Sequence, residues 1–266
     1  MQDRFNRNIN YLRISVTDRC NLRCKYCMPE GGISLLKHEN ILSLEEIAEF
    51  VKVAVNKGIK KVRITGGEPL VRRNIVHLIE MLSKIDGIED LSLTTNAILL
   101  EEFAEPMAKV GLNRVNISLD TINAIKFKEI TRGGDINKVF KGIEAAKNAG
   151  LLPIKINCVV NKSSNEIDAQ EVKSFCEDND LKIQFIHQMN IETGEFSIVE
   201  GGTGGNCKVC NKLRLSSDGF LRPCLFNDVS FNIRDLGFEN AIENALEAKP
   251  ECGTKSSINK FNFIGG

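Results

Sequence analysis

Short apolar runs alternate along the chain with longer segments in which apolar residues recur every three or four positions. The runs are rich in β-branched residues and predict strands, whereas the longer segments predict amphipathic helices. The expected strands read LRISV (12–16), KVRIT (61–65), LSLTT (91–95), RVNISLD (114–120), PIKINCVV (153–160) and KIQFIHQM (182–189). This alternation predicts six βα-type units between residues 12 and 190, with the strands in a parallel sheet.

The helix expected after Ser43 carries the clearest start and stop signals. Ser43 and Glu46 form the S-x-x-E pattern of a capping box, and Gly58 supplies a left-handed stop. Further helices fit NIVHLIEMLSKI (74–85), LEEFAEPMAKVG (100–111) and INKVFKGIEAAKNAG (136–150). Pro106 is expected to disturb the second of these because it lacks a backbone N–H.

Six parallel strands can form an open sheet or a partial barrel, and periodicity alone does not choose between them. We expect an α/β fold with a partial (β/α)6 barrel of the TIM type over residues 1–190. A small C-terminal cluster-binding module is expected over residues 191–266, because the glycine-rich NIETGEFSIVEGGTGGN (190–206) breaks the pattern after Met189. The carboxyl ends of the strands should form the working face.

Charge narrows the choice of partners. The 266 residues include 35 basic and 35 acidic side chains, so no overall field recruits nucleic acid or an anionic membrane. The polar start MQDRFNRNINYLRISV and the absence of an apolar run of bilayer length predict a cytoplasmic protein without a membrane partner.

Cysteine is the residue type that points to chemistry. A reducing cytosol favours thiolates that bind metal or react over disulfides. Six of the nine cysteines form two groups, Cys20, Cys24 and Cys27 as C-x3-C-x2-C, and Cys207, Cys210 and Cys224 as C-x2-C-x13-C. Three thiolates can bind three irons of a [4Fe-4S] cluster and leave the fourth iron open, whereas a zinc site would need a further ligand from elsewhere. Cys158 and Cys176 are expected to be packed thiols.

The first cysteine group, with the aromatic Tyr26 before its last cysteine and GGEP at 66–69, resembles the radical S-adenosylmethionine (SAM) superfamily. The resemblance implies that Cys20, Cys24 and Cys27 hold a [4Fe-4S] cluster whose open iron binds SAM, and that a flavodoxin- or ferredoxin-type protein donates the electron. Glycines at 66 and 67 would let backbone approach the ligand closely. The SAM-binding residues that the resemblance implies are Tyr26, Gly66, Gly67, Glu68, Pro69, Ser118 and Met189.

Within the superfamily the chain is similar to the GTP 3′,8-cyclase family of molybdenum cofactor biosynthesis. The similarity is carried by LRISVTDRCNLRCKYCMPEGG, VRITGGEPLVRR, LTTNAILL, VNISLDT, CNKLRLSSDGFLRPCLF and the terminal IGG. It implies a second [4Fe-4S] cluster on Cys207, Cys210 and Cys224 that binds the guanine of GTP, and a radical that takes hydrogen from ribose C3′ before C8 is attacked. The implied GTP-binding residues are Arg13, Arg63, Thr94, Lys155, Lys212 and Arg214, and Gly265 and Gly266 would reach into the active site.

Several positions depart from that family's pattern. Lys212 stands where arginine is usual, Gln184 and His187 stand where arginine and glutamate are usual, and residues 190–206 form a shorter segment. Cys252 is either a surface or packed thiol, or a fourth ligand that would close the second cluster. These departures favour an alternative, in which the same radical chemistry acts on a different small molecule or a peptide. A third hypothesis treats both cysteine groups as structural zinc sites of a binding module.

Overall fold

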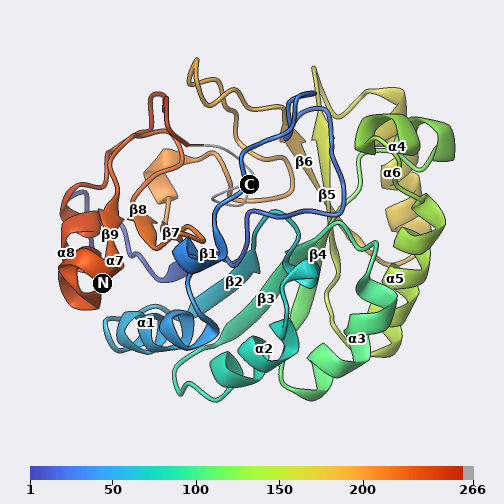
Figure 1. Cartoon of the computed structure of the whole chain (residues 1–266). Helices are drawn as coiled ribbons and strands as arrows, with labels where there is room; N and C mark the ends of the chain where they lie inside the picture. The colour runs from blue at the N-terminus through green and yellow to red at the C-terminus, as the bar shows by residue number, and fades with distance from the viewer. Residues whose placement is uncertain (260–266) are drawn as a thin grey trace.

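The structure is a computed structural model, and it describes residues 1–259. One nine-stranded sheet organises it, in the order β6-β5-β4-β3-β2-β1-β7-β8-β9 (Figure 1). The first six strands are β1 Tyr11–Ser15, β2 Lys61–Thr65, β3 Asp90–Thr95, β4 Arg114–Ser118, β5 Lys155–Val160 and β6 Lys182–His187. They pair in parallel as predicted, and the sheet has two ends, which confirms the α/β fold and the partial barrel.

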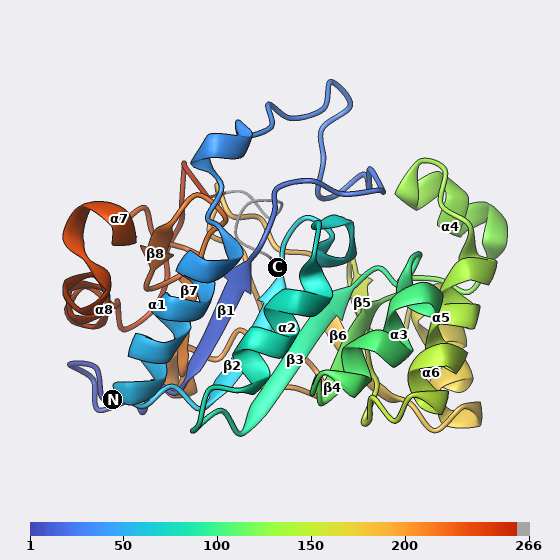
Figure 2. The ribbon, with the colours of Figure 1, turned by 60° about the horizontal axis from the view of Figure 1, so that its bottom comes forward.

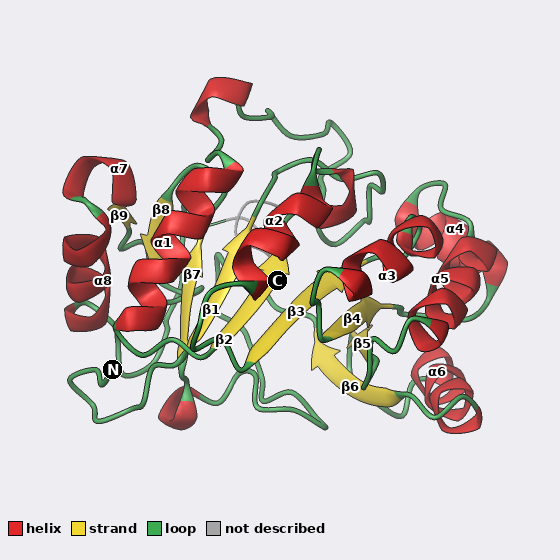
Figure 3. Ribbon diagram, turned by 90° about the horizontal axis from the view of Figure 1, so that it is seen from below, coloured by secondary structure: helices red, strands yellow, loops and turns green. Residues whose placement is uncertain are grey.

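Helices α1 to α6 lie between successive strands of the chain, and α7 and α8 follow the last strand; Figure 3 shows α1, α2 and α3 on the outer face of the sheet. Their bounds are α1 Leu44–Asn56, α2 Ile75–Ser83, α3 Leu100–Lys109, α4 Ala124–Thr131, α5 Ile136–Asn148, α6 Ile167–Asp178, α7 Ile233–Leu236 and α8 Phe238–Glu247. The capping box at the start of α1 is present, because Ser43 Oγ accepts from the Glu46 N–H and Glu46 Oε2 accepts from the Ser43 N–H. Pro106 lies inside α3, which continues for three more residues.

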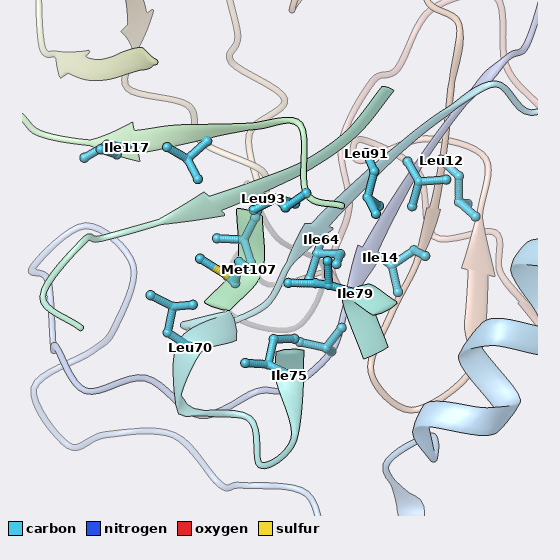
Figure 4. Close-up of a cluster of buried hydrophobic side chains, with 14 of the residues drawn as sticks. Leu12, Ile14, Ile64, Leu70, Ile75, Ile79, Leu91, Leu93, Met107 and Ile117 are labelled. Atoms are coloured by element: carbon cyan, nitrogen blue, oxygen red, sulfur yellow. The ribbon is translucent and has the colours of Figure 1, made fainter. Parts of the chain in front are cut away.

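Side chains alternate between the two faces of each strand, and this alternation separates core from site. Leu12, Ile14, Ile64 and Leu93 point outward, are fully buried and pack under the helices (Figure 4). Cys158 and Cys176 belong to the same core, which confirms them as packed thiols. The intervening positions, such as Arg13 and Arg63, face inward, so this face is polar although the strands are parallel.

The sequence after residue 206 extends the same sheet. β7 Lys212–Leu215 pairs in parallel with β1, and β8 Phe220–Arg222 and β9 Phe231–Asn232 follow as antiparallel strands. Leu213, Leu215 and Leu221 join the main core. The proposed division into residues 1–190 and 191–266 stays a prediction. Among residues 1–259, no helix is both long enough and apolar enough to cross a bilayer.

Candidate functional site

A cavity of about 490 Å³ lies on the inner face of the sheet. Both cysteine groups line it, Cys20, Cys24 and Cys27 from the loop after β1, and Cys207, Cys210 and Cys224 from the C-terminal part. The other predicted site residues that line it are Tyr26, Gly66, Gly67, Ser118, Met189, Arg13, Arg63, Thr94, Lys155, Lys212 and Arg214. Glu68 and Pro69 are buried beside it, and Gly265 and Gly266 lie outside the described residues. One cavity therefore brings together two cysteine groups that are far apart in the sequence.

The first cysteine group lies on a long loop that runs above the carboxyl ends of the strands (Figure 2). The loop is attached to the end of α4, because the Arg23 N–H donates to Thr131 O at 3.2 Å and the Lys25 N–H donates to Ile130 O at 3.0 Å. Within the loop, the Leu22 N–H donates to Cys20 Sγ at 3.3 Å. Such N–H donors stabilise a thiolate, which is the form that binds iron.

The thiols of this group differ in their tendency to ionise. A hydrogen bond between Cys24 and Cys27 lowers the pKa of Cys24, and the same bond, with burial, raises the pKa of Cys27. Burial raises the pKa of Cys20 to about 11. Metal binding requires the deprotonated sulfur. The binding of iron would therefore have to supply the free energy that deprotonates Cys20 and Cys27.

Gly66 and Gly67 explain why the loop can lie so close to β2. A Cβ at position 67 would lie 2.3 Å from Arg19 O, and one at position 66 would lie 2.9 Å from Thr17 O. The Gly67 N–H donates to Thr17 O at 2.7 Å and fixes this contact. Any larger residue would push the cysteine loop away from the sheet.

Glu68 is a buried carboxyl directly behind the cavity wall. Its oxygens accept from the Leu70 N–H at 3.0 Å, the Thr95 hydroxyl at 2.8 Å and the Asn96 N–H at 2.8 Å. Burial nevertheless raises the pKa of Glu68 to about 7. The Asn96 side chain in turn lies 3.8 Å from Cys20 Sγ, so Glu68 positions a neighbour of the first cysteine group.

Asp120 is a site residue that the sequence reasoning missed. It accepts from the Val159 N–H at 2.8 Å and from the Tyr26 hydroxyl, and Tyr26 also hydrogen-bonds Cys24. Burial raises the pKa of Asp120 and, with the Asp120 charge, raises that of Tyr26. Asp120 follows β4 at a strand end, and its place in SLD was the available signal.

The second cysteine group is connected to a buried lysine. Lys249 is 1% exposed, and its Nζ donates to Lys212 O at 2.8 Å and Pro223 O at 2.7 Å. Nζ also lies 3.6 Å from Cys210 Sγ. Burial tends to raise the pKa of Cys210, but the charge on Lys249 and other donors lower it below its ordinary value.

A fourth thiol lies at the second group. Cys252 Sγ is 2.9 Å from Cys207 Sγ, and this hydrogen bond raises the pKa of Cys252 to about 11. The side chain is exposed.

Strand register brings three arginines together on the inner face. Arg13 pairs with Arg63 on one side and with Arg214 on the other, so guanidinium groups from β1, β2 and β7 form a row. Burial and neighbouring cations lower the pKa of both Arg63 and Arg214 to about 10. Burial, with the Arg13 charge, lowers the pKa of Lys212 to about 8.

Tyr11 lies beneath this row and was also missed. Cζ of Arg63 lies 5.4 Å from its ring centroid and Nζ of Lys212 lies 5.6 Å from it, both cation–π distances. The Tyr11 hydroxyl is buried and finds no hydrogen-bond partner within residues 1–259. Asp90 is the only acidic side chain among the described lining residues, and it pairs with Arg114 at 2.6 Å. The cavity is therefore electropositive and fits a polyanion.

The positions that depart from the cyclase pattern also line the cavity. Gln184 Nε2 donates to Gly201 O at 3.2 Å, and His187 Nε2 lies 3.1 Å from Glu200 Oε1. Phe185 and Glu200 form a β-bridge, so the short segment after β6 folds back along that strand. Gln184 and His187 thus hold this wall of the cavity.

The residues fit two [4Fe-4S] clusters and SAM. Each group supplies three thiols that face one cavity, the first group has a glycine cradle that a Cβ would fill, and donors already point at sulfur. No three His, Cys, Asp or Glu side chains among residues 1–259 are arranged around a single metal ion.

Comparison with known proteins agrees with this geometry. The family model described as the Radical SAM superfamily matches residues 14–176. The chain is 41% identical to the GTP 3′,8-cyclase of Petrotoga mobilis over 304 positions, covering 94% of both chains. It is 43% identical to the GTP 3′,8-cyclase of Thermodesulfovibrio yellowstonii, covering 89% of this chain and 88% of that protein. The 304 aligned positions exceed the 266 residues of this chain, so the Petrotoga protein carries insertions relative to it.

The fold is similar to that of solved structures. SuiB of Streptococcus suis bound to S-adenosylmethionine superimposes with a TM-score of 0.66 at 17% identity, over 92% of this chain and 66% of that chain. The chain therefore belongs to the radical SAM superfamily, whose cofactors are SAM and iron–sulfur clusters, and within it to the family of the GTP 3′,8-cyclases.

Proposed function

We propose that this chain is a GTP 3′,8-cyclase with one [4Fe-4S] cluster on each cysteine group. The observation that carries the proposal is the single cavity that both cysteine groups line, Cys20, Cys24 and Cys27 together with Cys207, Cys210 and Cys224, and that cationic side chains line as well. Cys20, Cys24 and Cys27 would hold the cluster that binds SAM, and this cluster would supply the one-electron radical chemistry that the reaction needs.

The protein's part is to bind and orient the nucleotide. Arg13, Arg63 and Arg214 form a row on which triphosphate oxygens can accept bidentate hydrogen bonds. We assign the base to the second cysteine group, which lines the same cavity as the row, since β7 begins only two residues after Cys210. The ribose would then lie between the two cysteine groups, in the cavity that both of them line.

Gly66, Gly67 and Glu68 support the part of the cavity beside the first cysteine group, where SAM would bind. Gly66 and Gly67 keep the cysteine loop close to β2, and we assign Ser118 and Met189, which line the cavity, to the nucleoside part of SAM.

We also assign a flavodoxin- or ferredoxin-type electron donor and a cytoplasmic location, where a reducing environment keeps the cysteines as thiols.

The test uses GTP deuterated at ribose C3′. Anaerobic enzyme with SAM and dithionite should release 5′-deoxyadenosine that carries the deuterium, together with a nucleotide cyclised between C3′ and C8. If 5′-deoxyadenosine forms at the same rate with and without GTP and contains no deuterium, GTP is not the substrate.

A second candidate is a peptide-modifying enzyme. Cys252 favours it, because a fourth thiol beside the second group would leave no iron there for a nucleotide. In the same assay this candidate predicts that GTP stimulates nothing, whereas a peptide substrate stimulates SAM cleavage.

A further inference from the structure

Cys252 belongs to the second cysteine group in space, although it follows Cys224 by 28 positions in the chain. Its Sγ lies 2.9 Å from Cys207 Sγ. The next residue, Gly253, lines the cavity, and a Cβ placed there would lie 2.9 Å from Cys224 Sγ. Residues 252 and 253 therefore contact two of the three thiols that the second cluster would use.

The backbone that leads to Cys252 is anchored from two directions. On one side Lys249 Nζ donates to Lys212 O and Pro223 O, and it approaches Cys210 Sγ. These acceptors flank Cys210 and Cys224 in the chain. The segment that begins at Lys249 is therefore fixed relative to both of these thiols.

On the other side Arg7 holds the residues just before Cys252. One guanidinium nitrogen donates to Cys207 O at 2.8 Å and to Glu251 O at 2.7 Å, and the other donates to Pro250 O at 2.6 Å. Asp3 Oδ2 accepts from Arg7 Nε at 2.7 Å and fixes the orientation of the guanidinium. Because Arg7 joins Glu251 to Cys207, the thiol of Cys252 stays near this group whatever its rotamer.

We propose that Cys252 binds the fourth iron of the second cluster in the substrate-free protein. This closes a cluster that the other three cysteines leave open. The side chain is exposed, so Sγ can rotate away from Cys207 to reach its own iron, and solvent accepts the proton that the thiol loses on binding. No electron is transferred in this exchange of a proton for iron.

The inference that Cys252 is a ligand deepens the proposed function. One consequence, the replacement of Cys252 by guanine, rests on that function. A guanine can bind the same iron only after the Cys252 sulfur leaves and takes a proton back. Cys252 would thus protect the cluster until substrate arrives.

The experiment isolates the second cluster in the variant Cys20→Ala/Cys24→Ala/Cys27→Ala and compares it with and without Cys252→Ala. After anaerobic reconstitution, each protein is treated with one equivalent of ferricyanide and followed by EPR. Loss of one electron gives [4Fe-4S]³⁺, and an iron without a cysteine ligand then leaves as Fe²⁺ and yields a [3Fe-4S]⁺ signal. We expect this signal to be at least about tenfold stronger when Cys252 is absent.

Cys176→Ala in the same background is the matched control, since Cys176 is buried on α6 and should leave the signal at the parent level. Equal [3Fe-4S]⁺ signals in the parent and the Cys252→Ala protein would overturn the proposal. If the variant that lacks Cys20, Cys24 and Cys27 does not fold, the wild-type chain is compared with the single variant Cys252→Ala, both with SAM bound. SAM then occupies the open iron of the first cluster.

Adding GTP separates this inference from the proposed function. GTP that alters the EPR spectrum of the reduced second cluster in both proteins supports substrate entry after Cys252 leaves. GTP that alters neither spectrum counts against GTP as substrate, while the ferricyanide comparison still decides whether Cys252 is a ligand.

Discussion

At the scale of single residues, the absence of a side chain at position 67 determines where the first cysteine group lies. The Gly67 position has no room for a methyl group, because the carbonyl of Arg19 would be 2.3 Å away. GGEP was identifiable in the sequence, but this reason for its glycines was not, since it depends on how the loop packs against β2.

We expect Gly67→Ala to displace the cysteine loop and lower the iron content of the reconstituted protein by about half, since only the first cluster should be lost. Gly31→Ala in the same loop is the control, because nothing lies within 4 Å of the Cβ it would add. Iron and sulfide analysis with EPR measures the effect. Full iron content in Gly67→Ala would contradict this explanation of the motif.

Glu68 gives a prediction about pH. Its pKa in the folded chain is about 7, above the usual 4.5, so the folded state holds a proton that the unfolded state has already released. Stability should therefore fall as pH rises from 4.5 through 7, with a contribution from Glu68 of about 3 kcal/mol.

Urea unfolding of the metal-free chain at pH 5 and pH 8 tests this prediction. The side chain in Glu68→Gln is neutral at both pH values. The unfolding free energy of this variant should therefore fall by about 3 kcal/mol less between pH 5 and pH 8 than that of the wild type. An unchanged difference would show that the Glu68 carboxyl is ionised in the folded state at both values.

At the scale of elements, the sequence was sufficient for β1–β6, which the structure places within two residues of the predicted bounds. The later strands were missed, although Asp218-Gly219 between the apolar runs of β7 and β8 is a hairpin signal. Helices α4, α6, α7 and α8 were also missed; the apolar faces of α4 and α6 are less regular, and α7 is only four residues long. The arginine row could not be predicted, because it depends on β7 pairing with β1 across about 200 residues of chain.

The arginine row predicts how substrate binding responds to mutation. Arg63→Gln should raise the dissociation constant for GTP about 10- to 100-fold, because a hydrogen bond to a charged group contributes about 1.5–3 kcal/mol. Lys138→Gln, on the exposed side of α5, is the matched control. Calorimetric titration of GTP into the reconstituted enzyme measures both. If both variants bind GTP as tightly as the wild type, the row does not bind phosphate.

At the scale of the whole molecule, the two ends of the described chain meet at the second cysteine group. Arg7 joins the N-terminal segment to Cys207 and to residues 250–251. In addition, α8 packs on α1, where the rings of Phe238 and Phe50 meet edge-on with their centroids 5.7 Å apart. Sequence patterns assigned the cysteines to groups but contained nothing that predicted this closure, because Arg7 lies in no recognisable motif.

Arg7→Met should therefore affect stability and the second cluster together. The substitution removes the ion-pair partner of the buried Asp3 carboxylate and the side-chain donor to the carbonyls of Pro250 and Glu251, and it leaves Cys207 O with only the Cys210 N–H, at a cost of about 3–5 kcal/mol. Thermal unfolding and iron release to a chelator measure the two effects. Arg4→Met, on an exposed neighbour, should change neither; a stable Arg7→Met protein with normal iron retention would show that the closure does not depend on this residue.

The position of β1 between β2 and β7 also affects how the chain is synthesised. During translation one edge of β1 has no neighbour until residues 212–215 leave the ribosome. About 200 residues separate the two strands, which at about 5–20 residues per second corresponds to roughly 10–40 seconds. An unpaired edge is a template for pairing with other chains, so chaperone capture of the nascent chain should peak in this interval, and chains truncated before residue 212 should aggregate.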